Sequence, residues 1–205
     1  MWIKICGMTS EQAVETALYE RADAIGFVFA PSVRQLQPAR AAQLALPARG
    51  RILCVAVTLH PSQAAIDQIL REFSPDVLQT DLSDIAQLRL PAQLTVLPVV
   101  RAGSSLAGTV PGAVPPRILY EGPRSGTGMA TDLRQATPLT RRTQLILAGG
   151  LTPHNVGAAI AAVQPFGVDV SSGVEAVPGQ KDPRKIVEFI RAARAAFAGV
   201  THEAN

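Results

Sequence analysis

Eight short apolar runs, separated by helical patterns, predict that this 205-residue sequence folds as a single-domain (β/α)8 barrel (TIM barrel) of the α/β class. Regular alternation of strand-like and helix-like segments is typical of a parallel sheet covered by helices. Such a barrel needs at least about 200 residues, so one domain accounts for the chain. An open, doubly wound sheet is the alternative, and it accommodates six strands more easily than eight.

The expected strands are short runs rich in β-branched and other apolar residues. Parallel strands that are covered on both faces read as continuous apolar runs rather than as alternating ones. In chain order the expected strands are Trp2–Cys6, Ala24–Phe29, Arg51–Val57, Asp76–Gln79, Leu94–Val100, Arg117–Tyr120, Gln144–Ala148 and Gly167–Val170.

Helical patterns fill most of the intervals between these strands, and residues typical of helix N-caps, such as Ser10 and Ser62, precede two of them. The segment Gly103–Pro116 is rich in glycine, serine and proline, so we expect the fifth helix to be short or missing. The barrel then spans residues 1–200, and residues 201–205 form a disordered C-terminal tail. The expected helices are Glu11–Arg21, one that begins at Pro38, Gln63–Phe73, one around Ser83–Leu88, Thr152–Val163 and Asp182–Phe197.

The composition excludes several classes of protein. With 47% hydrophobic and 17% charged residues, the chain can bury a large core and is not a disordered protein. No apolar run approaches the roughly 18 residues of a membrane span, and the N-terminus lacks a signal-peptide pattern, so we expect a cytoplasmic protein without a membrane partner. The net charge is only +3 and the basic residues are scattered, which predicts no nucleic-acid partner. No long apolar seam marks an interface, so a monomer is expected.

Cysteine and histidine residues give no sign of a disulfide framework or a metal site. The two cysteines, Cys6 and Cys54, are too few for a framework, and both lie in apolar runs. The three histidines are isolated and show no metal-ligand spacing, so no metal ion is expected.

Glycines and hydroxyl residues gather where several strands are expected to end. In a barrel the carboxyl ends of the strands and the loops after them form the active face. The loops with Gly149-Gly150, with Ser171–Gly173 and with Ser125–Gly128 can present backbone N–H groups to an anion. One such loop alone is weak evidence, because an ordinary tight turn explains it. Three at the same end of a barrel predict a phosphorylated small-molecule ligand.

The first strand places two reactive groups on one face. Cys6 precedes a glycine at a strand end, where a thiolate can reach a substrate, although small cysteines there often serve only packing. Strand alternation puts Lys4 on the same face, and a buried lysine needs a partner. Asp169 faces away from its apolar neighbours, so we expect it to meet Lys4 inside the barrel. This pair is either part of a functional network or a structural ion pair.

Two further charged residues lie at strand ends or in loops. Glu121 ends an apolar run, where a carboxyl group can serve as a general acid or can be solvated. Arg34 can hold a carboxylate through its planar guanidinium, or it can be an ordinary surface charge. Spacing alone does not decide between these alternatives.

Four strings of residues closely resemble the phosphoribosylanthranilate isomerase family. The resemblance runs from Trp2 to about residue 197, and it is strongest in the first thirty residues and from Gln144 to Lys185. Other phosphate-binding barrels share only the glycine loops, so these long strings are specific. They are Lys4–Thr9, Ala22–Phe29, Leu147–Pro153 with Asn155, and Gly167–Glu175.

The resemblance implies an isomerase of tryptophan biosynthesis, and therefore of aromatic amino-acid biosynthesis. Its reaction is an Amadori rearrangement that converts N-(5-phosphoribosyl)anthranilate to 1-(2-carboxyphenylamino)-1-deoxyribulose 5-phosphate. A general acid assists opening of the ribose ring, and a general base then removes the proton at C2′ of the Schiff base. The resulting enolamine tautomerises to the ketone. The reaction only moves protons, so the resemblance implies no metal and no organic cofactor.

The resemblance also implies roles for individual residues. Cys6 falls on the general base and Glu121 on the general acid, while Asp169 falls on a residue that contacts the sugar. Arg34 matches the arginine that holds the anthranilate carboxylate, and Asp81 occupies a position that lines the substrate site. The implied phosphate-binding residues are Gly126, Gly128, Gly149, Gly150, Ser172 and Gly173.

Several positions depart from the family pattern. Glu121 stands where the family has aspartate, and Asp81 stands where it has a histidine in the motif after the fourth strand. Ser125 replaces a usual glycine. The longer side chain of Glu121 and the added negative charge of Asp81 affect the rate and the substrate specificity more than the type of reaction. A catalytic group that is misplaced by about 1 Å can lower the rate by about 100-fold.

Two alternatives remain at this point. The sister aminoaldose isomerase of histidine biosynthesis shares the fold and the reaction, but it uses a carboxylate where this chain has Cys6. The alternative from another functional class is a non-catalytic sensor of phosphorylated ligands. It is considered because Glu121 and Asp81 differ from the family pattern.

Overall fold

A computed structural model gives the fold of the chain. It describes residues 1–103, 114–122 and 133–203, with the side chains of residues 201–203 excepted. Within these residues most of the barrel strands are followed by a helix, as the sequence predicts.

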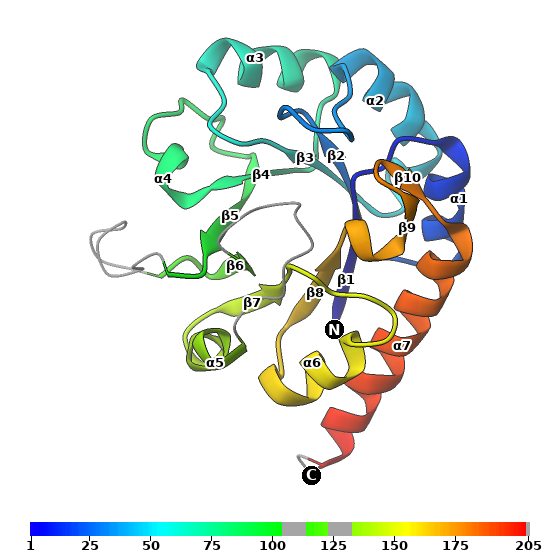
Figure 1. The fold of residues 1–205 in the computed structure, drawn as a ribbon. Helices are drawn as coiled ribbons and strands as arrows, with labels where there is room; N and C mark the ends of the chain where they lie inside the picture. The colour runs from blue at the N-terminus through cyan, green and yellow to red at the C-terminus, as the bar shows by residue number, and fades with distance from the viewer. Residues whose placement is uncertain (104–113, 123–132, 204–205) are drawn as a thin grey trace.

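Eight parallel strands form a closed barrel in which each strand pairs with its neighbour in the chain and β8 returns to β1. Figure 1 shows the strands around a common centre with the helices outside them. The predicted (β/α)8 barrel is therefore confirmed, and the open sheet is excluded. The strands are β1 Trp2–Cys6, β2 Ala24–Val28, β3 Leu53–Val57, β4 Val77–Asp81, β5 Thr95–Arg101, β6 Arg117–Glu121, β7 Gln144–Leu147 and β8 Gly167–Val170.

The helices cover the outside of the barrel, and their first residues explain where several begin. Ser10 and Ser62 accept hydrogen bonds from backbone N–H groups of α1 and α3 through their side chains, and Pro38 begins α2. The helices are α1 Glu11–Tyr19, α2 Pro38–Ala45, α3 Gln63–Glu72, α4 Leu82–Ile85, α5 Leu133–Ala136, α6 Val156–Val163 and α7 Pro183–Glu203, with short 3-10 helices η1 Leu46–Ala48, η3 Thr137–Arg141 and η4 Ser172–Val174.

Two apolar clusters stabilise this arrangement. One lies between the strands and the helices, where the rings of Phe27 and Phe73 meet edge to face with centroids 5.2 Å apart. The other fills the inside of the barrel and includes Trp2, Val55 and Ile146. Because apolar side chains fill the interior, the barrel is a packed core and the polar groups are confined to one end.

Three strands extend beyond their predicted ends and take in charged residues. β4 continues to Asp81, β5 to Arg101 and β6 to Glu121, where the sequence predicted ends one or two residues earlier. Their backbones still pair with neighbouring strands, since Asp81 lies opposite Val99 and Arg101 opposite Glu121. An apolar run indicates only the part of a strand that packs in the core, so the sequence pattern did not include the charged last residues of these strands.

Two further elements differ from the sequence expectation. Helix α7 runs to Glu203 rather than ending at Phe197, so it includes three of the residues assigned to a tail. The division into a barrel of residues 1–200 and a disordered tail of residues 201–205 stays a prediction. A two-stranded sheet of β9 Glu175–Val177 and β10 Gln180–Lys181 follows β8 and was not predicted.

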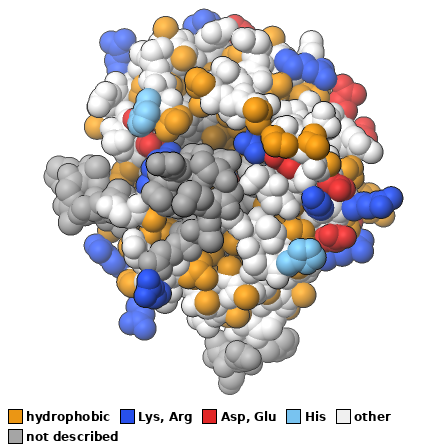
Figure 2. All heavy atoms as spheres, in the orientation of Figure 1, with side chains coloured by type: hydrophobic (Ala, Val, Ile, Leu, Met, Phe, Trp, Pro, Cys, Tyr) orange, Lys and Arg blue, Asp and Glu red, His pale blue; other side chains and the backbone are white. Residues whose placement is uncertain are grey.

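The expected short or missing fifth helix concerns the segment between β5 and β6. Residues 104–113 of that segment lie outside the described residues. Among the described residues, no helix has the length and apolar character that crossing a membrane demands. Figure 2 shows basic and acidic side chains interspersed on the face turned to the viewer, with hydrophobic side chains between them.

Candidate active site

One pocket at the carboxyl ends of the strands brings together most of the residues that the sequence singled out. Its lining comes from β1, β2, β3, β4, β5, β6 and β8 and from the loops after β2, β3, β7 and β8. This is the end of a barrel at which enzymes of this fold carry their active sites. The predicted residues that line it are Cys6, Arg34, Asp81, Glu121, Gly149, Gly150, Asp169 and Ser172.

Three predicted phosphate-binding residues are not among the residues that line this pocket. Gly126 and Gly128 lie outside the described residues. Gly173 packs against the loop after β7, and a Cβ atom there would lie 1.9 Å from the carbonyl oxygen of Leu151. Only glycine allows this approach of two backbones, so the loop after β8 needs Gly173 for packing whether or not its N–H group meets a ligand.

Cys6 lies beside a buried ion pair inside the barrel. Lys4 is fully buried, and its Nζ atom donates to Oδ1 of Asp169 at 2.9 Å, as strand alternation predicted. Gly26 on the neighbouring strand leaves room for both side chains of β1, because a Cβ atom there would lie 2.9 Å from Sγ of Cys6. The three side chains of Lys4, Cys6 and Asp169 therefore form one group, of which Cys6 and Asp169 line the pocket.

The surroundings of Cys6 favour the neutral thiol at rest. Burial raises the pKa of Cys6, and the positive charges of Lys4 and Lys181 offset only part of that effect. Burial also lowers the pKa of Lys4, but the charges of Asp169 and Cys6 and the hydrogen bonds to both together outweigh burial and leave the net pKa raised. Lys4 is thus a permanent positive charge next to the sulfur, placed to stabilise a thiolate when one forms.

Arg34 is held by a carboxylate of the protein itself. Its Nε and Nη2 atoms donate to the two oxygens of Glu175 at 2.6 and 2.8 Å. Lys181 donates to the same carboxylate at 2.8 Å and to the carbonyl oxygen of Ser171 at 2.9 Å. This buried group fixes the loop after β2 against the loop after β8.

Glu175 stays ionised over the whole physiological range. Burial raises its pKa, but the hydrogen bonds and charges of Arg34 and Lys181 outweigh burial and bring the pKa to about 2. Sequence reasoning gave Glu175 and Lys181 no role. Neither has a local signal, since their importance comes from a contact with the distant Arg34.

A second, partly buried group of charges lies across the pocket. Arg101, the last residue of β5, donates to Oδ1 and Oδ2 of Asp81 at 2.6 and 3.1 Å. Its Nη1 atom donates to Oε1 of Glu121 at 2.7 Å. Arg101 was missed in the sequence, although a charged residue directly after the apolar run Leu94–Val100 is the kind of signal that identified Glu121.

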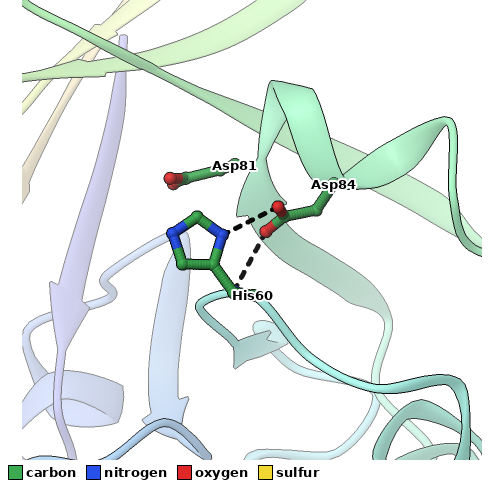
Figure 3. A group of neighbouring side chains, drawn as sticks. All are labelled: His60, Asp81 and Asp84. Atoms are coloured by element: carbon green, nitrogen blue, oxygen red, sulfur yellow. Dashed lines mark hydrogen bonds and ion pairs between the residues drawn. The ribbon is translucent and has the colours of Figure 1, made fainter.

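His60 and Asp84 extend this group at the rim. The nearest oxygen and nitrogen ligand atoms of His60, Asp81 and Asp84 all lie within 4.8 Å of one another. Figure 3 shows the imidazole near both carboxylates, with dashed lines that join His60 to Asp84. Nδ1 of His60 contacts Asp84 at 2.9 Å, which raises the pKa of His60, and Asp81 is bound by Arg101. Because each carboxylate already has a cationic or hydrogen-bonding partner, the group is an ion-pair network, and we assign no metal ion to it.

The loop after β7 is shaped for close approach to a ligand. Gly149 and Gly150 both have positive φ angles, of 90° and 68°, which other residues rarely adopt. The side chain of Asn155 braces the loop, because it donates to the carbonyl oxygen of Gly150 at 2.9 Å and accepts from the N–H group of Thr152 at 2.7 Å. The two glycines line the pocket ahead of α6.

The fold and the pocket define a (β/α)8-barrel enzyme that offers a thiol and carboxyl groups for proton transfer beside glycine-rich loops suited to an anion. The sequence model of the family described as N-(5'phosphoribosyl)anthranilate (PRA) isomerase matches residues 3–192. The chain belongs to this family.

Similar proteins come from several bacteria. The N-(5'-phosphoribosyl)anthranilate isomerases of Mesorhizobium japonicum and Nitrobacter hamburgensis are 37% and 39% identical to this chain, and each match covers 95% of it and 95% and 93% of the relative. The phosphoribosyl anthranilate isomerase structure from Thermotoga maritima is 28% identical with a TM-score of 0.79, covering 95% of this chain and 99% of that one. Another structure, with 28% identity, a TM-score of 0.76 and the same coverage, is a complex with reduced 1-(o-carboxyphenylamino)-1-deoxyribulose 5-phosphate.

Glu175→Gln is expected to destabilise the fold in a pH-dependent way. The substitution leaves Arg34 and Lys181 without their carboxylate, a loss on the order of 3 kcal/mol for a buried pair. Because the pKa of Glu175 is lowered from 4.5 to about 2, its contribution is complete above about pH 4.5 and is lost as the pH falls toward 2. Urea unfolding at several pH values measures this. The exposed Glu188→Gln is the control, and a wild-type advantage that does not shrink in acid contradicts the assignment.

Cys6 is expected to react with iodoacetamide slowly at neutral pH and faster as the pH rises. The thiolate is the reactive form, and the raised pKa keeps its fraction small at pH 7. A Cys54→Ser background removes the second thiol. This matters because the pKa of buried Cys54 is also raised, to about 11, so its labelling would show a similar dependence on pH. Mass spectrometry of labelling between pH 7 and pH 10 is the measurement. Equal rates at both ends of this range contradict a raised pKa.

Proposed function

We propose that the chain catalyses the Amadori rearrangement of N-(5'-phosphoribosyl)anthranilate to 1-(2-carboxyphenylamino)-1-deoxyribulose 5-phosphate, a step of tryptophan biosynthesis. The observation that carries the proposal is a single pocket that holds Cys6 and Glu121 together with the glycine loop after β7. Membership of the isomerase family supports the choice of substrate. The proposal includes a cytoplasmic location and a monomeric state. It also includes no metal and no cofactor, since the reaction only moves protons.

Ring opening is the first step, and Glu121 is the proposed general acid. As the bond between C1′ and the ring oxygen breaks, the nitrogen lone pair forms the Schiff base and the oxygen takes a proton from Glu121. A carboxyl group positioned at the transferred proton contributes about 100- to 10,000-fold in rate. Arg101 donates to Glu121, so the carboxylate that forms in this step faces a positive charge.

Proton removal from C2′ is the second step, and Cys6 is the proposed base. The thiolate takes the proton, the electron pair of the broken C2′–H bond forms the C1′–C2′ double bond of the enolamine, and the enolamine tautomerises to the ketone. Lys4 supports this role, because its charge is held next to the sulfur by Asp169. Cys6 is neutral in most molecules at rest, so only the minority thiolate form is active. Asp169 itself lines the pocket, where the sugar is proposed to lie.

Binding of the two ends of the substrate is assigned to the rim. The phosphate is proposed to lie on backbone N–H groups of Gly149, Gly150, Ser172 and Gly173, with Gly126 and Gly128 as further ligands. Arg34 is the proposed partner of the anthranilate carboxylate. Two of its N–H groups donate to Glu175, and a guanidinium has five, so donors remain for the substrate.

Cys6→Ser is the experiment that tests the base. With N-(5'-phosphoribosyl)anthranilate generated in situ, the decay of its fluorescence gives the rate, and we expect a loss of at least about 100-fold, because an alcohol is a far weaker base than a thiolate. Cys54→Ser is the matched control, since Cys54 is buried on β3 away from the pocket, and it is expected to keep wild-type kcat. A Cys6→Ser variant as fast as wild type removes the base assignment, and a wild-type protein without turnover favours a ligand sensor.

Glu121→Gln tests the acid in the same assay. The amide keeps the size of the side chain but carries no transferable acidic proton, so we expect kcat to fall by about 100-fold or more. Unchanged kinetics move the role to another group. Glu121→Asp shortens the side chain by one methylene, and its rate reports whether the longer acid is well placed.

A further inference from the structure

Arg101 links two strand ends that the proposed mechanism treats separately. It lies at the end of β5, between β4, which ends in Asp81, and β6, which ends in Glu121. Two of its nitrogens contact Asp81 and a third contacts Glu121, at distances between 2.6 and 3.1 Å. All three residues line the pocket.

The bonds to Asp81 fix the plane of the guanidinium. A pair of N–H groups that meets both oxygens of one carboxylate defines direction as well as distance. The Asp81 side chain is itself buried, and its backbone pairs with β5 opposite Val99. The orientation of Arg101 is therefore set from β4, and Nη1 is left directed at Glu121 on β6.

We propose that Arg101 is a positioning residue for the general acid, that it fixes the carboxyl group of Glu121 at the ring oxygen of the substrate, and that Asp81 serves the reaction through Arg101. This inference rests on the proposed function. It assigns a role to Arg101, which sequence reasoning missed, and changes the role of Asp81 from substrate contact to support of the arginine.

Geometry is the first reason why the reaction needs this support. A glutamate side chain has three rotatable bonds, and each one that is left free spreads the position of the carboxyl group. Misplacement by about 1 Å costs about 100-fold in rate. The 2.7 Å bond from Arg101 restricts the carboxyl group of Glu121 to one place in the pocket.

Charge is the second reason. When Glu121 gives its proton to the ring oxygen it becomes a carboxylate, and a fixed positive charge beside it stabilises the state that forms. Arg101 keeps that charge throughout. Burial lowers its pKa, but its interactions with the carboxyl groups of Asp81 and Glu121 together outweigh burial and raise the net pKa above its ordinary value.

Arg101→Gln tests the proposal against Arg117→Gln, a control on β6 whose guanidinium donates to Gln144 and stacks over Phe166. We expect Arg101→Gln to lower kcat by about 10- to 100-fold with little change in KM, because the acid is misplaced while substrate contacts remain. Arg101→Lys restores the charge but not the paired bonds to Asp81, and is expected to recover part of kcat. Arg117→Gln is expected to keep both constants.

A double-mutant cycle separates an action through Glu121 from a direct one. In a Glu121→Gln background, followed at high enzyme concentration, Arg101→Gln is expected to add less than about twofold, because the two residues act as one unit. Asp81→Asn is likewise expected to add little to Arg101→Gln. If the losses multiply in either cycle, or if Arg101→Gln raises KM at unchanged kcat, Arg101 contacts the substrate directly and the proposal is overturned.

Failure of the inference is distinguishable from failure of the proposed function. Turnover by the wild-type enzyme tests the function alone, whatever the variants do. Wild-type turnover together with a fully active Arg101→Gln variant overturns only the role of Arg101. Thermal unfolding of each variant shows whether it folds. If Arg101→Gln does not fold, Arg101→Lys replaces it, alone and in the cycle with Asp81→Asn, and the same outcomes support or overturn the proposal.

Discussion

The constraint on which the site depends is that charged side chains buried at the end of the barrel must pair with one another. An isolated buried charge is too costly for a folded protein of ordinary stability. Each charge in the pocket therefore has an opposite partner, and the partners come from different strands or loops. These groups are Lys4 with Asp169, Arg34 and Lys181 with Glu175, and Arg101 with Asp81 and Glu121. Pairing of this kind fixes the positions of the side chains that a reaction needs.

The same constraint sets the electrostatics of the proposed chemistry. The thiol of Cys6 is kept neutral by burial, yet it lies beside a lysine whose charge is secured by Asp169. On the other side of the pocket Glu121 lies beside an arginine whose charge is secured by Asp81. In both places a proton-transfer group has a cation next to it, and a carboxylate holds the cation. The anion that each group must become is thereby stabilised without a mobile ion.

Much of the fold could be predicted because it follows from local patterns. Apolar runs marked all eight strands, and Ser10 and Ser62 marked the starts of two helices. The contact between Lys4 and Asp169 was also predictable, since strand alternation and the need of a buried lysine for a partner left few choices. The small sheet of β9 and β10 was not predicted, because its strands are short and carry no period.

The sequence by itself determined the barrel, the family and the residue types at the strand ends, because hydrophobic periodicity and long specific strings are written along the chain. Apart from the pair of Lys4 and Asp169, only the tertiary structure decided which charged side chains contact one another. Arg34 and Glu175 are 141 residues apart in the chain, and Arg101 joins two carboxylates that lie 20 residues before and after it. Such contacts depend on closure of the barrel, which brings the ends of distant strands into one ring, and no local pattern carries that information.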